Sequence, residues 1–214
     1  PAHQLAQVVP GARGAADDIL RRNQLPLLKT LGKDVAFLQE YMVARRTEDL
    51  LSHFPSVSLP GGLMGWDEVF RAIDGIKNRV GSARFDRIEA VAKELWRMND
   101  ELGLRALLDE GILSGDAYSA MGTIHPHYIP FQRADFVDQI HRSFTKPEAN
   151  VSSTGIKRMK PEGSVRTLDK PLERLLAEMH KTQAIIFRNR AARGIVAALA
   201  KVEADTGESL VRYL

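Results

Sequence analysis

The sequence predicts an all-α fold, a multi-helix bundle with one long C-terminal helix, an extended proline-rich crossing segment and a long polar loop. Apolar residues recur at three- and four-residue spacing in almost every patterned segment. No set of alternating segments is large enough to form a sheet. The 214 residues are 44% hydrophobic and 27% charged, an ordinary globular composition with enough length for one or two cores.

The first part of the chain divides into an N-terminal helical segment at 1–32 and a helical bundle at 33–146. Within the bundle, we expect a helix from Lys33 to about Phe54 that ends at Pro55. Its apolar positions at helical spacing are Val35, Leu38 and Met42.

Three further helices follow the turn-rich break at 54–62. A short helix is predicted around 65–81, where Val69, Ile73, Ile76 and Val80 recur. A longer helix is predicted from Ala83 to Asp109, with a kink at Gly103, because glycine costs about 1 kcal/mol relative to alanine inside a helix. Its apolar stripe is Phe85, Ile88, Ala92, Leu95, Leu102 and Ala106. Ser114 is the expected N-cap of a third helix at 114–121.

The stretch "IHPHYIPFQR" (124–133) predicts a fixed extended crossing between helices. Pro126 and Pro130 restrict the backbone. The side chains expected to pack on neighbouring helices are Tyr128, Ile129 and Phe131. His125 and His127 face opposite sides of an extended strand, so we expect no metal there and little stability loss when either is removed. The alternative is a metal site completed by His141 or Asp135.

The last part contains one more helix at 134–144, an exposed polar loop at 147–168 that is a candidate for disorder, and a long helix with a short tail at 169–214. Asp169 and Pro171 start this helix, which should run to about Ala204 and measure roughly 50 Å. Its apolar stripe is expected to begin with Leu172, Leu175, Leu176, Met179, Ile186 and Phe187, and then to drift round the helix. The drift predicts that the helix past Gly194 packs against a different partner, which could be a second copy of the chain bound through 194–214. The tail "SLVRYL" could pair with a segment beyond Leu214.

Basic residues give the main signal for a partner. The net charge of +3 permits an acidic partner such as DNA but does not require one. Candidate nucleic-acid contacts are Lys157, Arg158, Lys160 and Arg166 in the loop, and Arg188 and Arg193 in the long helix, with solvated surfaces as the alternative. Arg190 lies beside the apolar stripe, and we expect it to pair with Glu40 or Glu48.

Other classes of site lack support in the sequence. The absence of cysteine excludes disulfides and thiolate sites. No Gly-rich phosphate loop or catalytic triad motif is present, and the carboxylates, including Glu173 and Glu178, are expected to solvate helix surfaces. We therefore expect no catalytic residue and no cofactor. The chain has no apolar run of membrane-spanning length, and its first residues lack the basic and apolar regions expected of a signal peptide. It begins without methionine, as a fragment of a longer chain would.

Three segments, in this order, resemble a helical region of the large polyvalent proteins of tailed phages and conjugative elements: "EYMVARRTEDL" (40–50), "LLDEGILSGDAYSAMGTIHPHYIPFQR" (107–133) and "GIKRMKPEGSVRTLDKPLERLLAEMHKTQAIIFRNRAARGIV" (155–196). The motif positions are Tyr128, Ile129, Pro130, Phe131, Arg133, Gly163, Ser164, Asp169, Pro171, Asn189 and Arg190. Lys170 separates Asp169 from Pro171, whereas the family pattern has them adjacent.

The resemblance covers about 40–210 and implies a non-catalytic structural or interaction module of a phage-encoded protein of the antirestriction or ejected internal virion type. Its partners would be other domains of the parent protein or virion components, in the virion or the host cytoplasm, with a role in DNA delivery or evasion of host defence. Two alternatives remain open, a nucleic-acid-binding domain that uses the basic residues of 157–170 with Arg188, Arg190 and Arg193, and a fragment of a lytic or nuclease enzyme.

Overall fold

All elements in the described part of the chain are helical, which confirms the all-α prediction. The computed structural model describes residues 2–54, 65–131 and 170–206. The helices are α1 (Ala2–Ile19), α2 (Leu25–Lys29), α3 (Val35–His53), α4 (Trp66–Val80), α5 (Ser82–Asn99), α6 (Arg105–Asp109), α7 (Gly115–Ile124) and α9 (Pro171–Thr206). The predicted helix at 134–144, the polar loop at 147–168 and the tail after Thr206 lie outside the described residues. None of the described helices combines the length and the apolar character that a membrane crossing requires.

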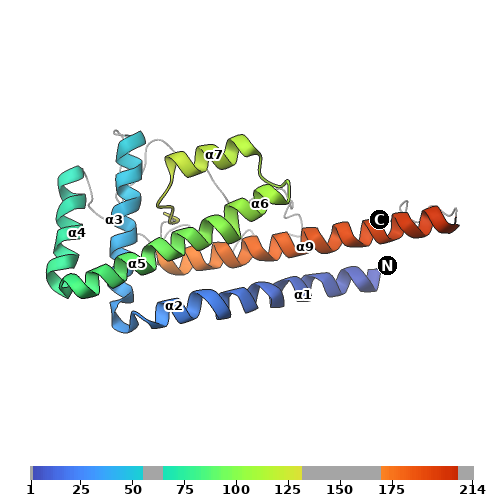
Figure 1. Cartoon of the computed structure of the whole chain (residues 1–214), viewed down its shortest axis with the longest axis horizontal. Coiled ribbons are helices and arrows are strands. Elements are labelled where there is room, and N and C mark those ends of the chain that lie inside the picture. Colours follow the sequence, from blue (N-terminus) through green and yellow to red (C-terminus); the bar gives the residue numbers. More distant parts are fainter. Residues whose placement is uncertain (1, 55–64, 132–169, 207–214) are drawn as a thin grey trace, which may run out of the picture.

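The helices form two groups that meet at one end of the molecule (Figure 1). In the first group, α9 lies lengthwise between α1 and α2 on one side and α5 and α6 on the other, and α1 runs antiparallel to α9. In the second group, α3 and α4 form an antiparallel pair that stands across the end of α5. The chain therefore brings α3 close to both the start of α9 and the start of α5.

The main core lies where α3, α5 and the first half of α9 meet. Its most deeply buried side chains are Leu38, Tyr41, Met42, Ile76, Ile88, Leu95, Ile129, Leu175 and Met179. Tyr41 contacts the edge of Phe85 with ring centroids 5.6 Å apart, an arrangement that aromatic pairs favour. A smaller core between α3 and α4 contains Ala44, Leu50, Leu51 and Val69. The periodic apolar residues predicted for these helices supply most of the main core, whereas Val69 is the one buried residue of the smaller core that was predicted.

The predicted Ser114 cap is confirmed, and a π turn lies where a kink at Gly103 was predicted. The Ser114 hydroxyl accepts a hydrogen bond from the Ala117 backbone N–H at 3.2 Å and caps α7. Gly103 lies in a π-helical turn (Asp100–Leu104) that joins α5 to α6. The Gln183 side chain of α9 donates a hydrogen bond to the Leu102 carbonyl within this turn. In place of the one predicted helix of 83–109, the structure therefore has α5 and α6 with a π turn between them.

Only the first half of α9 is buried. The buried positions among its described side chains begin with Pro171, Leu172 and Leu175 and end at Ile186. Farther along, Val196 is 47% exposed. At 36 residues the helix is about 54 Å long, and Figure 1 shows it continuing past the N-terminal end of α1. The long C-terminal helix is confirmed, and its two halves differ in burial.

Candidate functional site

The crossing segment after α7 lies against α3 and α9. Ile129 is 1% exposed, and Tyr128 and Phe131 are half-buried and pack on the main core. Pro130 is buried as well, whereas Arg133 lies outside the described residues. The three side chains thus occupy the anchoring positions that the sequence indicates.

Four charged or titratable side chains from α3 and the crossing segment form a cluster, here called the Asp49 cluster: Arg46, Asp49, His125 and His127. The side chains of Arg46 and Asp49 are 5% and 6% exposed, and Arg46 Nη1 lies 3.8 Å from Asp49 Oδ2. Asp49 Oδ2 accepts a hydrogen bond from the His127 backbone N–H at 2.8 Å, and Asp49 Oδ1 accepts one from His127 Nδ1 at 2.9 Å. One buried carboxylate therefore ties the crossing segment to α3.

His125 has a defined protonation state in this cluster. Arg46 Nη1 donates a hydrogen bond to His125 Nδ1 at 2.5 Å, so this ring must be neutral, with its proton on Nε2. Burial and the adjacent Arg46 guanidinium lower the pKa of His125 to about 4. Burial also lowers the pKa of Arg46, against the attraction of Asp49 and Tyr128.

We expect the neutral His125 to make folding stability depend on pH. Between the ordinary histidine pKa of about 6.5 and the folded value of about 4, the unfolded chain binds a proton that the folded chain does not. Stability should therefore be lost as the pH falls from about 6.5 toward 4. The variant His125→Asn keeps a side-chain acceptor near Arg46 but cannot titrate. Urea unfolding at several pH values should show a smaller loss for this variant than for the natural chain, and equal losses would contradict the assignment.

Tyr128 extends the same contact region to α9. Its hydroxyl donates a hydrogen bond to Glu178 Oε2 at 3.1 Å, and the Arg46 guanidinium lies 5.5 Å from the centre of its ring. Burial is the main cause of the raised pKa of both Tyr128 and Glu178. The expectation that Glu178 solvates the helix surface is wrong, because Glu178 is half-buried and accepts a hydrogen bond from Tyr128.

The contacts also change the interpretation of the histidines. The sequence predicts that either can be removed at little cost, because extended spacing points them to opposite sides. They do make different contacts, but each engages a buried charged partner on α3, Arg46 for His125 and Asp49 for His127. We now expect both to contribute to stability. Across the described ranges, no group of three His, Asp or Glu side chains is arranged to hold a metal ion.

A second polar cluster joins α9 to the end of α6. Glu110 accepts hydrogen bonds from Asn189 Nδ2 at 3.3 Å and from Arg190 Nε at 2.6 Å, and it also pairs with Arg193. The expected pairing of Arg190 with Glu40 or Glu48 is wrong, because Arg190 pairs with Glu110. Glu40 pairs with Arg79 and Glu48 with Arg45.

The predicted nucleic-acid contacts are only partly placed by the structure. Lys157, Arg158, Lys160 and Arg166 lie outside the described residues. In α9, Arg193 is paired with Glu110, and Arg188 is half-buried with no described hydrogen-bond partner for its Nε. Arg190 and Arg193 of α9 therefore both pair with the Glu110 carboxylate.

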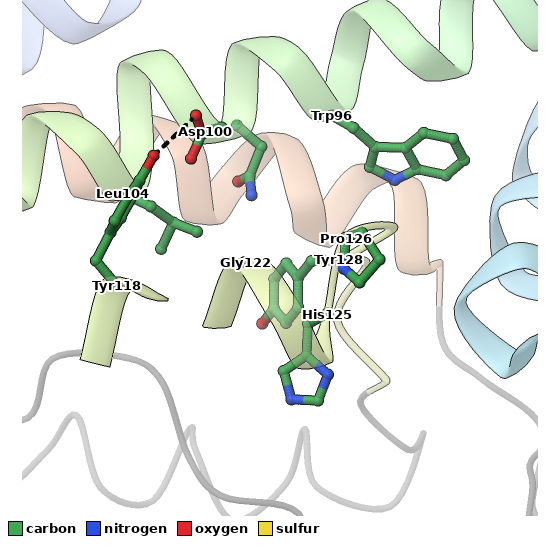
Figure 2. A pocket seen from close by; sticks show the side chains of 9 residues that line it. Trp96, Asp100, Leu104, Tyr118, Gly122, His125, Pro126 and Tyr128 are labelled. Carbon is green, nitrogen blue, oxygen red and sulfur yellow. Dashed lines mark hydrogen bonds between the residues drawn. The ribbon is translucent and has the colours of Figure 1, made fainter. Parts of the chain in front are cut away.

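A pocket of about 270 Å³ lies beside the Asp49 cluster, between α5 with its π turn on one side and α7 with the crossing segment on the other (Figure 2). Its lining residues are Trp96, Asn99, Asp100, Leu104, Tyr118, Gly122, His125, Pro126 and Tyr128. Tyr118 donates a hydrogen bond from its hydroxyl to Asp100 Oδ2 at 3.2 Å, which joins the two sides at one end.

Sequence reasoning missed Arg46, Asp49 and Trp96. A signal was available for the first two, since they follow Met42 at i+4 and i+7 and therefore fall on the buried face of α3. Charged residues on an apolar stripe indicate a buried pair. Trp96 adjoins Leu95 on the stripe of α5, but its contact with the His127 ring, with centroids 4.6 Å apart, has no local sequence signal.

No protein-family model, curated protein or solved structure matches this chain.

Proposed function

We propose that this chain is a non-catalytic helical interaction module of a large phage-encoded protein and acts in the virion or in the host cytoplasm during DNA delivery or evasion of host defence. Its partners would be neighbouring domains of the parent protein or virion components. The ordered motifs shared with the polyvalent proteins support the phage origin.

The observation that carries the proposal is the distal half of α9. Most of this helix beyond Ala191 is exposed, and its sequence from Ile195 to Ala200, "IVAALA", contains no charged residue. An exposed helix that continues past α1 and lacks charges over this stretch is suited to contact another protein surface.

The contacts of the ionisable groups are consistent with a scaffold. Asp49 fixes the crossing segment to α3, Glu178 fixes it to α9, and Glu110 fixes the end of α6 to α9. Each of these carboxylates joins segments that are distant in sequence. They therefore act as structural connections between helices.

The test uses the phage that encodes the parent protein. We expect Val196→Glu to lower the amount of the parent protein in purified virions, measured by quantitative mass spectrometry, because it places a charge on the apolar surface. Ala90→Glu, at an exposed position of α5, is the matched control and should leave the amount unchanged. Circular dichroism of both variants would show that the fold is kept. Equal incorporation of the two variants would contradict the proposal.

A second measurement separates this proposal from the nucleic-acid alternative. Fluorescence anisotropy with labelled duplex and single-stranded DNA should show no salt-sensitive binding at about 50 and 200 mM salt, since each phosphate contact made by a cation would make affinity fall with salt. Binding that weakens steeply over this range would favour a DNA-binding domain that uses the basic residues of 157–170.

A further inference from the structure

The pocket beside the Asp49 cluster has one wall with a buried polar group that lacks a partner. Trp96 is 9% exposed, and no described atom accepts a hydrogen bond from its indole N–H. Figure 2 shows the indole nitrogen on the side of the ring that faces Pro126 and Tyr128. The nitrogen has almost no accessible surface, so an acceptor in the pocket reaches it when the indole ring turns toward the pocket. A buried donor without an acceptor is unfavourable, which favours that turn once an acceptor is bound.

The other polar groups of the pocket restrict the chemistry of a ligand. Asn99 contributes a side-chain amide, which presents a donor and an acceptor next to each other. Asp100 contributes a carboxylate that accepts from Tyr118 and has further acceptor capacity. His125, whose Nδ1 accepts from Arg46, has its proton on Nε2 and is therefore uncharged. The pocket thus offers donors and acceptors together, without a free cation that would select an anion.

The remaining lining is flat and aromatic. The hydroxyls of Tyr118 and Tyr128 are bonded to Asp100 and Glu178, so their positions are fixed while their rings form part of the walls. With the indole of Trp96 they give the pocket three aromatic side chains. Leu104, Gly122 and Pro126 complete it. Aromatic walls favour a planar ring, and a volume of about 270 Å³ is large enough to hold one such group.

We propose that this pocket binds a planar heteroaromatic molecule with adjacent hydrogen-bond donor and acceptor groups, of the nucleobase class. The Trp96 indole N–H donates to a ring nitrogen or carbonyl, the Asn99 amide pairs with an adjacent donor and acceptor, and the tyrosine rings contact the flat faces. Such a base comes either from a free nucleoside or from an unstacked position in a single strand. This inference is independent of the interaction surface on α9.

The experiment follows the indole N–H directly. The chain contains two tryptophans, so the variant Trp66→Phe leaves Trp96 as the only source of an indole signal in a proton–nitrogen NMR spectrum. Titration with adenosine, guanosine, cytidine and uridine to about 10 mM covers dissociation constants in the millimolar range. We expect at least one nucleoside to shift the Trp96 signal downfield in a saturable way.

Two variants and one control compound sharpen the result. Asn99→Ala should weaken binding about threefold to tenfold, as expected for the loss of a hydrogen bond. Asn78→Ala, the same change at an exposed position of α4, should leave it unchanged. Phenol, which has the flat ring without adjacent donor and acceptor groups, should bind more weakly than the best nucleoside.

The outcomes assign the source of the base or overturn the proposal. A saturable shift with a neutral nucleoside identifies a small-molecule site. A shift only with a short single-stranded oligonucleotide, reduced by Asn99→Ala, identifies a base in a strand. The proposal is wrong if neither a nucleoside nor the oligonucleotide shifts the Trp96 signal. It is also wrong if phenol binds as tightly as every nucleoside, or if the Asn99→Ala and Asn78→Ala variants bind the nucleoside equally well.

Discussion

Replacing Asp49 with alanine should lower the free energy of unfolding by about 3–5 kcal/mol, the range expected when a buried ion pair loses one partner. In the variant, the Arg46 guanidinium stays buried without its counter-charge, and His127 loses both hydrogen bonds that hold it to α3. Urea denaturation followed by circular dichroism measures this change. The crossing segment should also loosen locally around His127, because Asp49 accepts both hydrogen bonds that hold this residue to α3.

The control is an exposed ion pair between α3 and α4. Glu40 and Arg79 lie 2.6 Å apart with side chains 49% and 53% exposed, so Glu40→Ala should cost no more than about 1 kcal/mol. The double variant Arg46→Met with Asp49→Ala should recover part of the loss, because no uncompensated charge is then buried. Equal effects of Asp49→Ala and Glu40→Ala would show that Asp49 does not have the structural role described above.

The second large effect is expected in α9. Leu175 is fully buried in the main core, and Leu175→Ala should cost about 2–5 kcal/mol through lost burial and the cavity left behind. Val196→Ala, farther along the same helix, should change stability by no more than about 0.5 kcal/mol, because Val196 is 47% exposed. Thermal and urea unfolding of the two variants would test whether only the first half of α9 anchors the helix. A loss at Val196 as large as that at Leu175 would contradict this division.

The helices were largely predictable from sequence because helix formation depends on local periodicity and capping. The apolar spacing in 35–53, 66–80 and 171–186 and the Ser114 cap all have local causes, and the structure has helices in these places. The drifting stripe of α9 likewise predicted that its two halves differ.

The polar contacts were less predictable because they depend on tertiary packing. Asp49 and His127 are 78 residues apart in sequence, and Arg190 and Glu110 are 80 residues apart. Sequence gives the charge of each residue but not which oppositely charged residue the fold brings near it. Arg190 was therefore assigned to carboxylates of α3, although its partner lies at the end of α6.

The π turn at Asp100–Leu104 makes the pocket sensitive to the length of this helix. A π turn holds one more residue than an α-helical turn, so removing one residue there would restore the regular α-helical spacing. A relative without that residue would have every side chain after the turn rotated by about 100° around the helix axis. Its Asp100 equivalent would no longer face Tyr118, and the wall of the pocket would have a different composition. The length of this helix, compared among relatives, would therefore indicate which of them have inherited the pocket.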